Sequence, residues 1–388
     1  VKDEKKLAWD HYQRPIKESK KDLIQTINNL ERPVNSDQMN EMFSNLDDSN
    51  FSELIEICRR LIYKLDGSDS NDRNSLINWK NKYMDILTNK YSTDLYSISI
   101  DSLSSIPKVL PMYSDEEKFV DGRIIIRDNF DKLLENNSKI FIFGEDVGKI
   151  GDVNQGLEGL QKKHGKNRVF DTSIRESTIV GQGIGMSMRG LRPIAEIQYL
   201  DYILYALQIL SDDLGTLTYR THGGQKAPLI VRTRGHRLEG IWHSGSPLGG
   251  MISFLRGVFI LTPRNMTKAA GFYNTLLDID QPGVVIEPLN GYRTKEQLPS
   301  NYGQFKTPIG EIEILKEGTD ITLVSYGSTF NIVINVAKEI EKYGISCEVI
   351  DVQSLIPFDI KKEISKSVIK TNRPLIIDED LPLSLIHI

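Results

Sequence analysis

The chain contains two regions that differ in the spacing of their apolar residues. From residue 1 to about residue 112, apolar residues recur three or four positions apart, as in the stretches 51–63 and 76–87, which predicts amphipathic helices. Beyond residue 112, short β-branched runs alternate with longer helical patterns. That alternation is typical of βαβ units and a parallel sheet.

The second region predicts two α/β sets in succession. In the first set, strands are predicted at 139–143, 193–198, 228–233, 258–262 and 284–287, with helices at 179–189, 202–219 and 266–277. In the second set, which begins near residue 319, strands are predicted at 320–326, 346–351 and 374–378, with helices at 331–343 and 360–369. Between the sets, residues 289–310 hold several Gly, Pro and polar residues and are predicted to form a loop with little regular structure.

Composition narrows the classes of partner. The 388 residues carry a formal net charge of -5 and no basic block, so nucleic acid or an anionic membrane is not favoured as the main partner. Cys58 and Cys347 lie far apart without a CxxC or Cys/His spacing, which argues against structural zinc and a disulfide scaffold. No apolar run approaches the roughly 20 residues of a spanning helix. We therefore expect a cytoplasmic protein in a reducing compartment.

The two ends of the sequence are unusual. The chain begins at Val1 rather than Met, so we expect a processed or truncated piece. The last six residues, LSLIHI, match the translation of a common sequencing adaptor, and residues 383–388 are therefore excluded from the predicted fold. The alternative is a genuine short apolar strand.

Polar residues that follow the predicted strands are the first candidates for chemistry, because ligands bind beyond the carboxyl ends of strands in open α/β sheets. Such residues occur at 144–146, 198–202 and 234–237, and His243 comes shortly afterwards. Upstream, residues 171–176 lead into a run rich in glycine. That run contains GxGxG, but it follows a predicted helix start rather than a strand, so close helix packing is favoured over nucleotide binding.

Taken in order, these motifs resemble the transketolase-like pyrimidine-binding domain of the beta subunits of thiamin-diphosphate-dependent 2-oxoacid dehydrogenases. The matching stretches are FGEDVG at 143–148, RVFDTSIRE at 168–176, GQGIGMSMRGLRPIAEIQYLDY at 181–202, WHSGSP at 242–247 and PRNMTKAAG at 263–271. The resemblance continues through TDITLVSYGS and CEVIDVQSLIPFD, the start of the family's C-terminal domain. The chain is similar above all to branched-chain-type enzymes, in a subgroup where the alpha and beta halves are fused in one chain.

The resemblance implies a domain plan. Residues 113–305 would form the pyrimidine-binding domain, with a parallel sheet and helices on both faces, and residues 306–382 a truncated transketolase C-terminal domain. Residues 1–112 would be a helical linker or docking segment, the tail of the alpha half.

The resemblance also assigns a catalytic role to Glu176, which would hydrogen-bond the aminopyrimidine ring of thiamin diphosphate and so promote ionisation of its thiazolium carbon. Tyr202 would pack against that ring and Ile174 would form an apolar wall. The alternative is a core role, because aromatic residues that start a helix are usually core residues. Gln198 and Glu145 complete the residues expected to bind the cofactor. Taken alone, Glu176 would be interpreted as an exposed residue in a first helical turn, stabilised by the helix dipole.

A second group of residues is expected near the mouth of the site. His243 matches a family histidine that handles the 2-oxoacid or the incoming lipoyl group, and is the second predicted catalytic residue. His236, Arg234 and Arg237 are expected to contact substrate or lipoyl, where the arginines would meet a carboxylate. A structural histidine and a protein interface are the respective alternatives.

One family motif is missing. The GDG sequence that holds magnesium and the diphosphate does not occur, so both are expected to be bound by an alpha domain, and this chain alone is expected to be inactive. The implied reaction is oxidative decarboxylation of a branched-chain 2-oxoacid or pyruvate. The implied partners are the alpha half, a second copy in a dimer or heterotetramer, and a dihydrolipoyl acyltransferase core with its lipoyl domain. The alternatives are a transketolase or deoxyxylulose-phosphate synthase activity, or a non-catalytic assembly subunit.

Overall fold

The structure is a computed structural model of the chain, and it describes residues 1–31, 43, 50–65, 71–91, 94–96, 103, 106–235 and 246–378. The chain separates into two compact units, residues 1–93 and residues 94–388.

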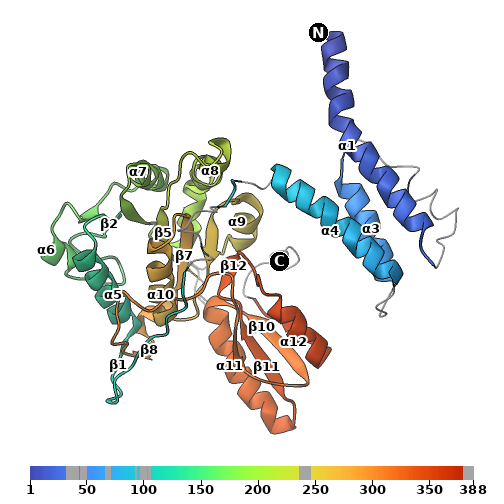
Figure 1. Cartoon of the computed structure of the whole chain (residues 1–388). Coiled ribbons are helices and arrows are strands. Elements are labelled where there is room, and N and C mark those ends of the chain that lie inside the picture. Colours follow the sequence, from blue (N-terminus) through green and yellow to red (C-terminus); the bar gives the residue numbers. More distant parts are fainter. Residues whose placement is uncertain are drawn as a thin grey trace. The chain divides into compact units, whose positions relative to one another are not determined.

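The described part of the first unit is helical, as the spacing of its apolar residues predicts (Figure 1). Its helices are α1 (Lys2–Asn28), α3 (Ser52–Lys64) and α4 (Asn71–Tyr91). They pack through buried residues at helical spacing, among them Leu23 and Leu76.

The second unit is built on a seven-stranded sheet with the order β12-β6-β7-β5-β4-β2-β3. All of its neighbouring strands are parallel except β12, which lies antiparallel to β6 at one edge. The five strands predicted for the first α/β set are present within two residues at each end. The strands are β2 (Ile140–Gly144), β3 (Val169–Asp171), β4 (Arg192–Glu196), β5 (Ile230–Gly235), β6 (Phe259–Leu261), β7 (Gly283–Pro288) and β12 (Ser354–Ile356).

Helices cover both faces of this sheet, so the predicted parallel α/β architecture is confirmed (Figure 1). On one face, α7 (Glu176–Met188) packs on β4 and contributes Val180 to a buried apolar cluster. On the other face, α5 (Gly122–Asn136) and α10 (Met266–Leu277) pack against each other and bury Phe130 and Phe272. Shorter helices are α6 (Leu160–His164) and α9 (Leu248–Phe254).

A smaller sheet with the order β13-β10-β11-β9 forms the second predicted α/β set. Phe330 of α11 packs on Leu323, whereas Ser367 and Thr371 of α12 hydrogen-bond Thr322, the preceding residue of the same strand. Because neighbouring strand residues face opposite ways, the two helices cover opposite faces. The elements are β9 (Glu313–Lys316), β10 (Ile321–Ser325), α11 (Gly327–Ile340), η5 (Glu341–Tyr343), β11 (Cys347–Asp351), α12 (Glu363–Thr371) and β13 (Pro374–Ile376).

Two local predictions are wrong. Residues 202–219 do not form one helix, because Gly215 N–H reaches back five residues to Leu210 O at 2.9 Å and widens the turn. The segment is divided into η2 (Leu200–Tyr205), η3 (Ile209–Leu214) and α8 (Leu217–Arg220). The predicted loop 289–310 contains η4 (Leu289–Arg293) and β8 (Lys295–Gln297), which pairs with β1 (Phe119–Asp121). A strand of three residues is too short to show a period in the sequence.

Candidate active site

A cavity of about 500 Å³ lies at the carboxyl edge of the seven-stranded sheet. All five residues that the sequence assigned to cofactor binding line it, although up to 57 positions separate them along the chain. The lining residues are Glu145, Ile174, Arg175, Glu176, Ser177, Gln198, Tyr202 and Tyr205. Another cavity, of about 390 Å³, contains none of the predicted site residues.

The parallel sheet explains why these residues meet. Glu145 directly follows β2, and Gln198 comes two residues after its neighbour β4, so both lie where adjacent parallel strands end. Tyr202 comes from η2, the short helix that follows β4. Glu176 is the first residue of α7, where the backbone turns from the extended conformation of Arg175 into the helix. A carboxylate in a first turn is favoured by the helix dipole.

Two carboxyl groups and two tyrosine rings line the cavity. Burial raises the pKa of Glu145, and the negative charges of Asp146 and Glu176 raise it further. Glu145 therefore keeps its proton to a higher pH than an ordinary glutamate. Burial likewise raises the pKa of the Tyr202 phenol, and the ring of Tyr202 lies edge-on to that of Tyr199, with 6.0 Å between their centroids.

One wall of the cavity is held by a hydrogen bond between two strand ends. Gln198 Nε2 donates to Asp146 Oδ2 at 3.2 Å, so the side chain after β4 is tied to the loop after β2. Two further lining residues are apolar or aromatic and open to solvent: Ile174 is 72% exposed and Tyr205 is 71% exposed. Exposed apolar side chains grouped at a cavity are typical of a surface that another chain covers.

Of the four residues predicted for the mouth of the site, the structure describes Arg234. Arg234, at the end of β5, is fully buried and pairs with Glu196 at 2.5 Å. Its predicted role toward substrate or lipoyl remains a prediction. His236, Arg237 and His243 lie outside the described residues.

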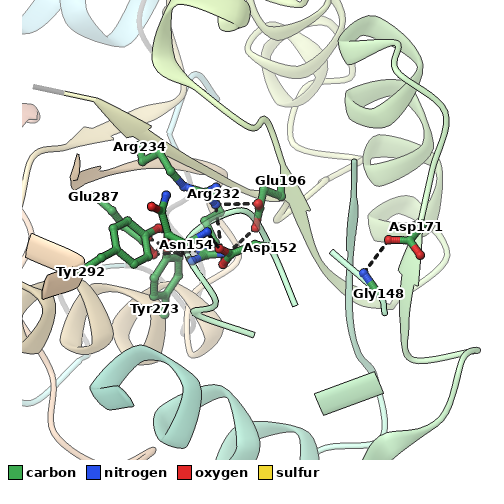
Figure 2. A network of polar contacts seen from close by, with 10 residues as sticks. All are labelled: Gly148, Asp152, Asn154, Asp171, Glu196, Arg232, Arg234, Tyr273, Glu287 and Tyr292. Carbon is green, nitrogen blue, oxygen red and sulfur yellow. Dashed lines mark hydrogen bonds and ion pairs between the residues drawn. The ribbon is translucent and has the colours of Figure 1, made fainter. Parts of the chain in front are cut away.

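The sequence did not reveal a cluster of fully buried charges in the second unit (Figure 2). Its charged members come from the loop after β2 and from β4, β5 and β7: Asp152, Glu196, Arg232, Arg234 and Glu287. Tyr273 and Tyr292 bond to Glu287 from α10 and η4. A signal was present, because in each of the three central strands β4, β5 and β7 an apolar run is followed by a charged residue near the carboxyl end.

Across the residues that the structure describes, no three His, Cys, Asp or Glu side chains are grouped so as to hold a metal ion. In the same part of the chain, no helix is both long and apolar enough to cross a membrane.

Comparison with known proteins places this geometry in a family. Residues 120–295 match the family described as "Transketolase, pyrimidine binding domain", and residues 310–384 match "Transketolase, C-terminal domain". The pyruvate dehydrogenase E1 component subunit beta of Acholeplasma laidlawii is 34% identical over 256 residues, which are 66% of this chain and 77% of the relative. The 2-oxoisovalerate dehydrogenase subunit beta of Bacillus subtilis (strain 168) is 32% identical over 249 residues, 64% of this chain and 75% of the relative.

Solved structures agree on the fold. A split-gene transketolase, described as an inactive beta4 tetramer, superposes with a TM-score of 0.53 at 19% identity and covers 66% of this chain and 78% of its own. The relatives favour a 2-oxoacid dehydrogenase over the alternative of a transketolase or deoxyxylulose-phosphate synthase. The chain belongs to the family of the beta subunits of 2-oxoacid dehydrogenase E1 components, which are thiamin-diphosphate-dependent oxidoreductases that work with an alpha partner in a multienzyme complex.

Proposed function

We propose that this chain supplies the pyrimidine side of a thiamin-diphosphate site and, together with an alpha chain or domain, carries out oxidative decarboxylation of pyruvate or a branched-chain 2-oxoacid. The observation that supports the proposal is the single cavity shared by Glu145, Glu176, Gln198, Tyr202 and Ile174. The donor set fits a planar heterocycle, because it combines carboxylates and an amide with an aromatic ring and an aliphatic wall.

Each side chain has a distinct part in this proposal. Glu176, the first residue of α7, would accept a hydrogen bond from the aminopyrimidine ring. Tyr202 and Ile174 would contact the faces of the ring. Glu145, whose pKa is raised by burial and by the nearby Asp146 and Glu176 carboxylates, would keep its proton to a higher pH than an ordinary glutamate at this wall of the cavity. When bound, thiamin diphosphate supplies the carbanion stabilisation that decarboxylation of a 2-oxoacid requires.

Three further parts of the proposal concern partners. The alpha chain would bind magnesium and the diphosphate and would cover the exposed rim at Ile174 and Tyr205. A second copy of the pair would complete a dimer or heterotetramer. A dihydrolipoyl acyltransferase core would present the lipoyl group that accepts the acyl unit.

The test uses the chain purified with its alpha partner, thiamin diphosphate and magnesium. Reduction of an artificial electron acceptor is followed with pyruvate, 2-oxoglutarate or 3-methyl-2-oxobutanoate, for the wild type and for Glu176→Gln. We expect turnover of one 2-oxoacid and a loss of at least about 100-fold in the variant, the usual scale for acid–base groups.

The matched control is Glu363→Gln. Glu363 is the first residue of α12, the same helix position as Glu176, but it does not line the cavity. It should keep wild-type turnover. If the folded, cofactor-loaded complex turned over no 2-oxoacid but transferred ketol units between sugar phosphates, the dehydrogenase proposal would be rejected.

A further inference from the structure

The buried charge cluster is centred on a guanidinium whose five N–H groups are all used (Figure 2). Arg232 donates from Nε and Nη2 to the two carboxylate oxygens of Glu287, at 2.9 and 3.1 Å, and from Nη2 to the Tyr292 hydroxyl at 3.0 Å. Its Nη1 donates to Asp152 at 2.8 Å and to Glu196. Such bidentate and charge-assisted bonds fix geometry as well as charge.

Asp152 differs from the other carboxylates in its origin. Glu196 and Glu287 belong to strands β4 and β7 on either side of β5, which carries Arg232, so the sheet already places them together. Asp152 comes instead from residues 145–159, the loop that follows β2. Its bond to Arg232 therefore joins this loop to the centre of the sheet across 80 positions of the chain.

The same loop carries Glu145, an acidic residue that lines the cavity, and its neighbour Asp146. Asp152 N–H donates to Asp146 O at 2.9 Å, and the Asp146 carboxylate in turn accepts the bond from Gln198. Glu145 directly precedes Asp146 in the chain and lines the cavity. A continuous set of bonds thus runs from Arg232 through Asp152 and Asp146 to the cavity wall.

The loop needs such support because its backbone is strained. Asp146, Asp152 and Gln155 have φ of +58°, +64° and +62°, values that residues other than glycine rarely adopt. Such conformations persist where the surrounding structure determines them. Gly148 N–H is also held, by Asp171 Oδ1 at 2.6 Å (Figure 2).

We propose that Asp152 and Arg232 are positioning residues, which hold the loop 145–159 so that Glu145 lines the cavity and Asp146 accepts the hydrogen bond from Gln198. The catalytic consequence rests on the proposed function, whereas the placement of the loop is a property of this chain alone. If the cluster were purely structural, its loss would destabilise the second unit as a whole. It would not affect the cavity more than other parts of that unit.

The first measurement is hydrogen exchange of backbone amides in the complex with the alpha partner. Asp152→Asn removes the carboxylate that receives the Arg232 bond but keeps nearly the same shape. We expect amides of residues 145–159 to exchange at least about tenfold faster, because their local opening is no longer restrained, while β2 and β5 are unchanged.

Tyr273→Phe is the matched control within the cluster. The Tyr273 hydroxyl donates to Glu287 Oε1 at 2.7 Å, on the side of the cluster that faces α10 rather than the loop. This variant should leave the exchange of residues 145–159 unchanged. Equal acceleration of the loop in both variants would mean that the cluster is structural only, and would overturn the proposal.

The second measurement concerns the cofactor and the reaction. In Asp152→Asn we expect thiamin diphosphate to bind about tenfold more weakly and kcat to fall about 10- to 100-fold, as displaced groups near the reacting atoms cause, with KM for the 2-oxoacid within about threefold. Tyr273→Phe should keep all three values. Wild-type turnover with unchanged binding, kcat and exchange in Asp152→Asn would overturn the proposal. Absence of wild-type turnover would instead reject the proposed function, and hydrogen exchange would still test the placement.

A milder variant addresses the possibility that Asp152→Asn does not fold. An added Cβ at Gly156 would lie 2.8 Å from Arg232 Nη2 and 3.0 Å from Asp152 Oδ2. Gly156→Ala therefore pushes the loop and the guanidinium apart without removing a charge. It should accelerate exchange of residues 145–159 in the same direction, and protection equal to that of the wild type would contradict the proposal.

Discussion

Replacement of Arg232 by methionine tests how strongly the buried cluster depends on its central cation. The guanidinium is fully buried and bonds to three carboxylates. Without it, Arg234 is the one remaining cation of the cluster, and the formal charge of the five charged members changes from -1 to -2. Removal of one partner from a buried ion pair costs about 3–5 kcal/mol, so we expect Arg232→Met to lower the free energy of unfolding by about that amount.

The loss of unfolding free energy in Arg232→Met, called the deficit below, should increase with pH. Burial already raises the pKa of Glu196, and Arg232 opposes that shift. In the variant the folded pKa of Glu196 rises further above its unfolded value, so ionisation of this group costs more stability as the pH increases. The deficit should therefore be larger at pH 8 than at pH 5.

Thermal and urea unfolding at the two pH values, followed by circular dichroism, measure both effects. The control is Arg123→Met, because Arg123 pairs with Glu158 at the surface and such pairs contribute about 0–1 kcal/mol. A deficit below about 1 kcal/mol in Arg232→Met, or one that does not change between pH 5 and pH 8, would refute the reasoning.

Two further predictions concern buried titratable groups. Burial raises the pKa of Asp351 to about 6 despite its pairing with Arg264, whereas the unfolded value is about 3.9, so the folded state takes up a proton and stability falls by about 3 kcal/mol as the pH rises from 4 through 6. Asp351→Asn should remove that fall in unfolding curves at pH 4.5 and 7, and a persisting fall would contradict this. Burial raises the pKa of the Cys58 thiol to about 11, so a thiol reagent at pH 8 should modify Cys58 only after unfolding, and rapid labelling of the native protein would disprove it.

The architecture could be predicted because its signals are local. Helix α10 has the predicted bounds 266–277, since a capping asparagine, Asn265, precedes a strongly periodic apolar stretch. The cavity could be predicted because the motifs around Glu145, Glu176 and Gln198 are each continuous in the sequence. The topology of the parallel sheet then brings the ends of these motifs together.

What could not be predicted depends on distant partners or on short segments. Strands β3 and β12 have three residues each, which is too few for an alternating pattern to stand out. The bond between Arg232 and Asp152 joins positions 80 apart, and no local rule specifies which acidic residue meets the guanidinium. Arg234 illustrates the same point, since its position after a strand indicated a ligand contact, but its partner at 2.5 Å is Glu196 of the neighbouring strand.

The cost of the buried cluster indicates why it lies at the carboxyl edge of the sheet. Replacing buried ion pairs with apolar residues is often neutral or stabilising, so stability alone does not account for five buried charges at this edge of the sheet. Charged hydrogen bonds instead specify one arrangement of their partners, and here they specify the position of a loop with three residues at positive φ. The sheet ends and the cavity begins at the carboxyl ends of these strands. A cluster at that boundary can fix the side chain of Glu145 relative to Glu176, which the helix α7 places independently.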